Sequence, residues 1–194
     1  MLNLTSKVEG FVKITDADTG EVLLDGHNSI HYENLSLAIA QSLADMQPGI
    51  IQEMHFGDGG AVVSGSGVIT YLPPNTTGPD ADLYNNTYYK VVNNLSPLNT
   101  DILENFITIN HLVNSVYSDI IITCTLDYSE PSDQSTFDDA TQETGNYVFN
   151  EIGLKVYDPV PQNGNLIAHI IFSPIQKSLN RKIVIQYTLR INLC

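Results

Sequence analysis

The chain has 194 residues, of which 42% are hydrophobic and only 15% are charged, and its formal net charge is −14. A chain of this length can bury a core without disulfides or metals, so we expect one domain. The acidic balance, 22 Asp and Glu against 8 Lys and Arg, disfavours direct binding to nucleic acid, because phosphates repel a negative surface. Asn, Ser and Thr provide most of the polar surface, and these short side chains suit protein–protein contact.

Targeting signals and cysteines point to no special compartment. The N-terminal residues lack a charged segment followed by an apolar one, and no apolar run approaches the roughly 18 residues of a membrane span. We therefore expect a protein of the cytoplasm, or of a particle assembled there, with no membrane partner. Cys124 is expected to be a buried small hydrophobe, while a disulfide through Cys194, within or between chains, stays open.

The N-terminal part predicts a hairpin, a helix and a short strand. Residues 7–30 contain two alternating segments around the turn-forming sequence DADTG. Residues 32–46 predict the one amphipathic helix, capped by Asn34 or a neighbour and ended by Pro48-Gly49. Its apolar face contains Leu35, Ala38, Ile39, Leu43 and Met46. Residues 50–60, IIQEMHFGDGG, predict a strand stopped by glycines.

The following region, residues 57–104, is predicted to be an extended loop or arm inserted in the domain. It is rich in Gly, Pro, Asn, Thr and Tyr, and at most one brief strand, GVITYL, is expected in residues 57–100. Loops of this length usually have a function or are ordered by a partner, and the tyrosines argue against disorder. We expect the arm to pack on a neighbouring protein and to be cleaved rapidly by protease when no neighbour is present.

The C-terminal half predicts mostly strands. NFITINHLV and SDIIITCTLDY alternate well, and NYVFNEIGLKVYD, LIAHIIFSPI and RKIVIQYTLRINL follow, with PVPQNGN as a turn. An acidic loop, SEPSDQSTFDDATQETG, separates the second strand from the third. Many short strands joined by turns indicate an antiparallel β-sandwich or a barrel-like sheet. We therefore expect residues 1–194 to form a single, mainly β domain with one helix and a long arm.

No motif supports catalysis, a metal or a cofactor, so we expect a protein that is not an enzyme. The five histidines, His27, His31, His55, His111 and His169, lack metal-ligand spacing, and His169 is expected to share a layer with Ile167 and Ile171. Asp16, Asp18 and Gly20 resemble the start of a calcium loop that lacks its final Glu, so a hairpin turn is favoured. A weak cation site at Asp138, Asp139 and Glu143 stays open. The glycine-rich residues 57–67 lack the spacing of a phosphate loop.

The C-terminal half resembles a family. FNEIGLKVYD, NGNLIAHIIFSPIQK and IVIQYTLRI are similar to the pattern of tail-collar fibre proteins and related tail or neck proteins of tailed bacteriophages. MHFGDGG resembles the segment that precedes this module, and residues 8–44 resemble the opening of phage virion structural proteins. Where the family has a short acidic turn, this chain has KVYDPVPQNGN. The matching residues are Glu151, Ile152, Gly153, Leu154, Gly164, Asn165, Leu166, Ile167, Ala168 and Pro174.

The resemblance implies a structural component of a phage virion on the tail side, in the neck, collar, baseplate or fibre attachment. Expected partners are other virion proteins and further copies of the chain in a homo-oligomer. A decoration protein of the capsid head is the alternative within this class, and a carbohydrate-binding module with a tyrosine platform is the alternative outside it. The predicted interface residues are Tyr71, Tyr84, Tyr88, Tyr89, Glu151 and Asn165.

Overall fold

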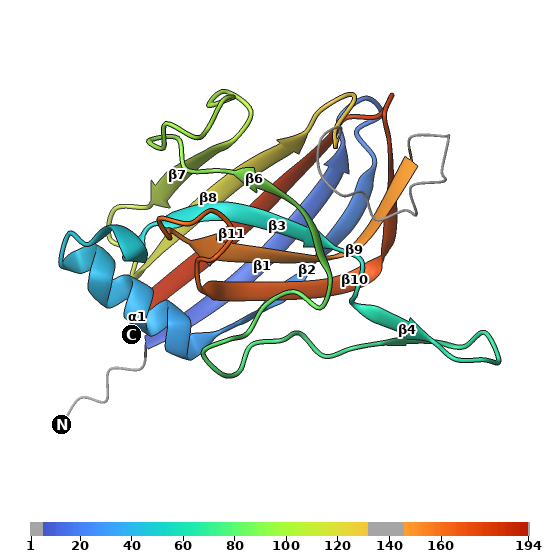
Figure 1. Cartoon of the computed structure of the whole chain (residues 1–194). Helices are drawn as coiled ribbons and strands as arrows, with labels where there is room; N and C mark the ends of the chain where they lie inside the picture. Colours follow the sequence, from blue (N-terminus) through green and yellow to red (C-terminus); the bar gives the residue numbers. More distant parts are fainter. Residues whose placement is uncertain (1–5, 132–145, 194) are drawn as a thin grey trace.

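The computed structural model describes residues 6–131 and 146–193, and it confirms a mainly β fold with one α-helix among these residues. A curled antiparallel sheet has the strand order β6-β3-β9-β10-β2-β1-β11-β8-β7, and β4 (Ala61–Val63) and β5 (Ile69–Tyr71) form a separate hairpin (Figure 1). The first strands of the large sheet are β1 (Ser6–Asp16), β2 (Val22–Ile30), β3 (Ile51–Gly57), β6 (Asn86–Val91) and β7 (Phe106–His111). The others are β8 (Tyr117–Leu126), β9 (Asn146–Val156), β10 (Leu166–Ser178) and β11 (Ile183–Leu193).

The sheet bends sharply at β2, which brings the apolar faces of its two halves together. Strand β2 pairs with β1 along most of its length but with β10 only through Ser29 and Ile30. A single apolar cluster joins the two halves, with Phe56 and Phe149 from one half and Ile122 and Tyr187 from the other. The core therefore lies inside the curl, as in a half-closed barrel.

The β1–β2 hairpin and the later strands were predicted correctly. The Asp16 carboxylate accepts the N–H groups of Asp18 and Thr19, and Gly20 adopts a left-handed φ of 77°, which confirms a hairpin turn at DADTG. The two alternating segments before the acidic loop pair as β7 and β8, and NYVFNEIGLKVYD forms β9. Most of the acidic loop, including Asp138, Asp139 and Glu143, lies outside the described residues, as does Cys194.

Helix α1 (Tyr32–Leu43) covers one end of the curled sheet (Figure 1). Its N-cap is His31, whose Nδ1 accepts the N–H of Asn34 at 3.2 Å. Asn34 itself donates from its side chain to the carbonyl of Leu166 at 2.8 Å, so it joins the helix to β10 instead of capping it. The helix ends at Leu43 rather than Met46, and the 3₁₀ turn Gln47–Gly49 leads into β3.

The region expected as one extended arm is divided in the structure. Residues 57–100 contain three strands rather than at most one, namely β4 (Ala61–Val63), β5 (Ile69–Tyr71) and β6. Strand β6 is a regular member of the large sheet, paired with β3, whereas the β4–β5 hairpin projects away from it (Figure 1). The alternation in GVITYL therefore indicated one strand of a hairpin, while NTYYKV was missed because its strand is short and surrounded by turn residues.

A bulge in β10 changes the side on which His169 lies. The register of β10 with β9 shifts between Leu166 and Ala168, so Ile167 is the extra residue. Ile167 faces the apolar interior near α1, whereas His169 lies opposite Gly153 on the outer face of β9 and β10. The prediction that His169 shares a layer with Ile167 is wrong for this reason, whereas Ile171, opposite Glu151, lies on the same face as His169 as predicted.

Candidate functional site

The outer face of β9 contains a buried carboxylate, Glu151, that binds the chain leading to and from the β4–β5 hairpin. Its oxygens accept the backbone N–H groups of Gly59 at 3.0 Å, Tyr84 at 3.0 Å and Asn85 at 2.9 Å. Burial by itself raises the pKa of Glu151, but hydrogen bonds from His169 and from the backbone of Asn85 and Tyr84 outweigh it, so the pKa lies below its ordinary value. The carboxylate is therefore ionised and anchors the loops at both ends of residues 59–85.

His169 completes this anchor. Its Nδ1 lies 2.9 Å from the backbone N–H of Asn75, which can only donate, so Nδ1 is the acceptor. The proton is then on Nε2, which donates to Glu151 Oε2 at 3.1 Å. Both side chains are fully buried and both ring nitrogens are engaged. The pair thus resembles a catalytic carboxylate–histidine pair in composition only, and its geometry serves to hold the backbone.

A second buried pair on β3 repeats the arrangement. Asn86 Nδ2 lies 2.9 Å from His55 Nδ1, and His55 Nε2 lies 2.9 Å from Glu53 Oε2. Glu53 also accepts the backbone N–H of Gln162 at 3.1 Å, and Lys155 Nζ donates to the carbonyl of the same residue at 2.9 Å. This second anchor fixes the β9–β10 loop, residues 157–165, on the outer face of the sheet.

The predicted interface residues do not gather on one surface. Tyr71 and Tyr84 are about half exposed, at 45% and 43%, and their hydroxyls donate to Ser173 Oγ and to the carbonyl of Pro73. Tyr88 is buried against Phe56, and Tyr89 stacks on His55 at a centroid distance of 5.6 Å.

Glu151 and Asn165, the other two predicted interface residues, differ from each other in exposure. Glu151 is fully buried, so neither it nor Tyr88 is accessible to a partner in this fold. Asn165 is exposed in the β9–β10 loop, where its carbonyl accepts the N–H of Val156 at 3.1 Å. The sequence placed Glu151 in a distinctive motif but carried no signal that the motif is a buried anchor.

The remaining candidates are the histidines outside these two pairs and the cysteine Cys124. In the part of the chain that the structure describes, no three His, Cys, Asp or Glu side chains come together in a way that could hold a metal ion. His27 packs against the ring of Phe11, with 4.7 Å between the ring centroids. Cys124 is buried, and desolvation raises the pKa of its thiol to about 12, so this residue is an unreactive part of the core, as predicted.

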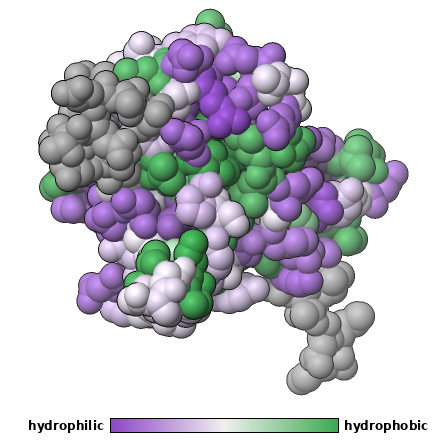
Figure 2. All heavy atoms as spheres, turned by 90° about the vertical axis from the view of Figure 1, so that its right-hand side faces the viewer, coloured by the Kyte–Doolittle hydropathy of each residue, from purple (hydrophilic) through white to green (hydrophobic). Residues whose placement is uncertain are grey.

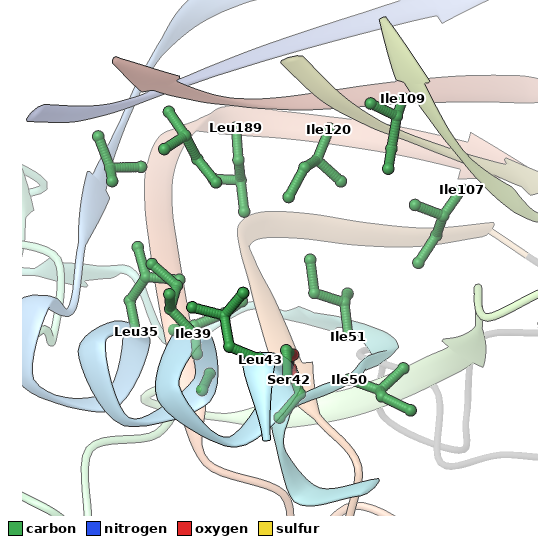
Figure 3. A pocket seen from close by; sticks show the side chains of 15 residues that line it. Leu35, Ile39, Ser42, Leu43, Ile50, Ile51, Ile107, Ile109, Ile120 and Leu189 are labelled. Atoms are coloured by element: carbon green, nitrogen blue, oxygen red, sulfur yellow. Dashed lines mark hydrogen bonds between the residues drawn. The ribbon is translucent and has the colours of Figure 1, made fainter. Parts of the chain in front are cut away.

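An apolar pocket of about 380 Å³ lies between α1 and the curled sheet (Figure 3). Leu35, Ile39, Leu43 and Ile51 face Ile107, Ile109, Ile120 and Leu189 across it, and Ile50 lies near its edge. The lining contains no charged residue, and the one side-chain hydroxyl, that of Ser42, already donates to the carbonyl of Gly49 at 2.7 Å. A binding group must therefore be apolar, since the pocket offers polar atoms no side-chain partner.

The second apolar surface is the β4–β5 hairpin. Val62, Val63, Val68 and Ile69 are all more than half exposed, and residues 59–79 include no charged side chain. Figure 2 looks onto the end of the molecule from which the hairpin projects and shows green and pale residues gathered in its lower part. Large apolar side chains that stay in water on a projecting element are typical of a contact surface.

Comparisons of this chain with models of protein families, with curated proteins and with solved structures gave no match. Among the described residues, no helix is both long and apolar enough to cross a membrane.

Proposed function

We propose that this chain is a non-enzymatic structural component of a tailed-phage virion, placed on the tail side and assembled through protein–protein contacts. The observation that carries the proposal is the distribution of apolar side chains. The β4–β5 hairpin, strand β7 and the loops around β7 keep large apolar groups in water, including Leu95, Leu103, Ile109 and Val113. Such groups favour burial against other polypeptides.

The polar interior supports the same proposal. The buried Glu151–His169 and Glu53–His55 pairs have their hydrogen-bonding groups occupied by backbone or side-chain partners of this chain. A general acid or base must reach a substrate proton, and neither pair is accessible. The groups of this chain that other molecules can reach therefore lie on its surface. The most apolar parts of that surface, the β4–β5 hairpin and the pocket beside α1, contain no charged side chain.

The resemblance of residues 7–60 and 145–192 to tail-collar and neck proteins gives the class of particle. Under this proposal the partners are other virion proteins and further copies of the chain, assembled in the cytoplasm of the host bacterium. The geometry gives less support to a carbohydrate-binding module, because Tyr88 is buried and Tyr89 is stacked on His55 instead of forming an exposed platform with it.

Quantitative mass spectrometry of purified particles of the encoding phage tests the proposal. A tail-side position predicts about a dozen copies or fewer per particle, as a single cyclic ring would contain. Hundreds of copies would place the chain on the head as a decoration protein. Absence from purified particles, with the chain still present in the infected cell, would refute a virion role.

A further inference from the structure

The β4–β5 hairpin and the apolar pocket lie at opposite ends of the molecule, and their surfaces match in chemistry. The hairpin projects on the side away from α1, whereas α1 forms one wall of the pocket (Figures 1 and 3). Both surfaces are apolar and lack charged side chains, although the chain as a whole carries a net charge of −14. A contact between these two surfaces would bring no acidic groups together.

The hairpin is ordered before it meets a partner. The Ser64 N–H donates to the Val68 carbonyl at 2.9 Å and the Gly67 N–H donates to the Ser64 carbonyl at 2.9 Å, which fixes the tip. At the base, the Gly60 N–H donates to Asn150 Oδ1 at 2.9 Å. Val63 and Ile69 form a cross-strand pair on one face of this ribbon. Insertion of a fixed tip costs less conformational entropy than insertion of a flexible loop.

The pocket is open and poorly suited to water. Leu43 and Ile109, with exposed fractions of 86% and 74%, lie at its rim, and Leu35, Ala38, Ile167 and Leu189 form buried parts of the lining. Water in such a space finds few hydrogen-bonding partners, so an apolar group that displaces it is favoured. The aliphatic side chains of Val63, Val68 and Ile69, which flank the tip at residues 64–67, are groups of this kind. The hydroxyls of Ser64 and Ser66 at the tip form a hydrogen bond with each other at 2.9 Å.

We propose that the β4–β5 hairpin of one copy packs the apolar side chains beside its tip, Val63, Val68 and Ile69, into the α1 pocket of the next copy. The contact joins two different surfaces, so an open assembly keeps one free hairpin at one end and one free pocket at the other until it closes. Contacts of this type produce a ring when the rotation between copies closes and a filament when it does not. The inference rests on the assembly role proposed above and names a second copy as the partner.

Two variants with defects on opposite surfaces test the proposal with the purified chain. Val63→Asp with Val68→Asp alters the hairpin, and Leu43→Asp alters the pocket rim. Sedimentation velocity should show that each variant self-associates at least about tenfold more weakly than the wild-type chain, because a charge would enter an apolar site. When mixed, the two variants should form a one-to-one dimer that does not grow, since one intact hairpin and one intact pocket remain.

Val160→Asp is the matched control, because this residue is exposed and lies outside the two surfaces; it should assemble like the wild type. Circular dichroism checks that each variant is folded. As a second measurement, Val68→Cys in one chain should form a disulfide with Leu43→Cys in another, both with Cys194→Ser. A pocket variant that fails to fold leaves this cross-link as the deciding result.

Three results would overturn the head-to-tail contact: a wild-type chain that stays monomeric, variants that assemble like the controls, or folded variants that form no dimer on mixing. If the pocket instead binds a small apolar molecule, the wild-type chain should stay monomeric. A hydrophobic dye should then bind equally to the wild type and to the hairpin variant. Virion incorporation is measured separately by mass spectrometry. A chain that is found in virions but does not self-associate would therefore contradict the contact alone. A chain that self-associates as proposed but is absent from virions would contradict the virion role alone.

Discussion

Replacement of Glu151 tests whether the buried carboxylate holds the loops beside the β4–β5 hairpin on the sheet. Glu151→Ala leaves the N–H groups of Gly59, Tyr84 and Asn85 and the Nε2–H of His169 without their acceptor. An unsatisfied buried polar group costs about 1–3 kcal/mol, so four such groups cost an amount comparable to the whole stability of a domain. The loops should therefore detach and become hydrated rather than stay buried without partners.

Detachment limits the loss of stability. We expect the free energy of unfolding to fall by about 3–5 kcal/mol, the usual effect of removing one member of a buried charged pair. Urea denaturation measures this change, and hydrogen exchange at the amides of Gly59, Tyr84 and Asn85 shows whether the loops have opened. Limited proteolysis should cut residues 72–85 in the variant while the wild type resists there.

Glu104→Gln is the matched control, since this half-exposed carboxylate pairs with Lys182 at 2.9 Å on the surface. Its removal should change stability by at most about 1 kcal/mol. Unchanged protection of the three amides in Glu151→Ala, together with a loss of less than about 1 kcal/mol, would refute the role of the anchor. If the anchor does hold these loops, rapid cleavage of the free chain, expected from the sequence throughout residues 57–100, should be confined to the hairpin and the loop that follows β6.

Acid should open the same anchor. Because the pKa of Glu151 is below its ordinary value in the folded chain, its stabilising contribution is complete above the unfolded pKa of about 4.3. The contribution is lost as the pH falls through the lower folded value. Hydrogen exchange at the amides of Tyr84 and Asn85 should therefore rise on acidification in the wild type and be largely insensitive to pH in Glu151→Ala, after correction for intrinsic exchange.

Three further predictions concern the interior. Gly164→Ala should destabilise the chain by about 1–3 kcal/mol in urea denaturation, because its Cβ would lie 1.7 Å from the Val156 carbonyl oxygen, while Gly65→Ala, in open space, should be near neutral. Burial lowers the pKa of Lys177 to about 8 in the folded chain, below the value of about 10.4 in the unfolded chain. Between these values the unfolded chain binds more protons, so the free energy of unfolding should rise from pH 8 towards 10. A Lys177→Met variant that retains this rise would contradict the assignment. In a Cys194→Ser background, Cys124 should react with a thiol reagent at pH 8 only after denaturation, and rapid labelling of the native chain would show that the core opens.

The elements with strong alternation could be predicted from the sequence. Hairpin β1–β2, strands β8 to β11 and the position of α1 follow from apolar spacing and turn residues, since each contributes to a continuous core. Strand β7 follows from its alternation, although most of it is exposed. Strand β3 was also expected, although both of its faces are buried. The glycines after it marked its end correctly, because Gly57 and Gly59 leave room for the backbone and side chain of residues 84 and 85.

The candidate site could not be predicted because it depends on contacts between distant segments. Nothing in FNEIGLKVYD shows that Glu151 meets backbone groups more than sixty residues away, at Tyr84 and Asn85. The single-residue bulge at Ile167 reverses the side on which His169 lies, and no turn residue marks it. The tyrosines were selected by composition, which does not separate the buried Tyr88 from the half-exposed Tyr84.

The charge of the chain gives a final prediction for the proposed contact between copies. Each copy carries a formal net charge of −14, so copies repel one another at a distance, while the hairpin tip and the pocket lining contribute no charge to the contact. Salt shortens the range of this repulsion, from about 10 Å at 0.1 M to about 3 Å at 1 M, and leaves an apolar contact largely intact. The association constant from sedimentation should therefore increase with sodium chloride concentration. A contact built from ion pairs would weaken instead, so a decrease with salt in the wild type, with the Val160→Asp control behaving alike, would show that charged groups and not the hairpin tip join the copies.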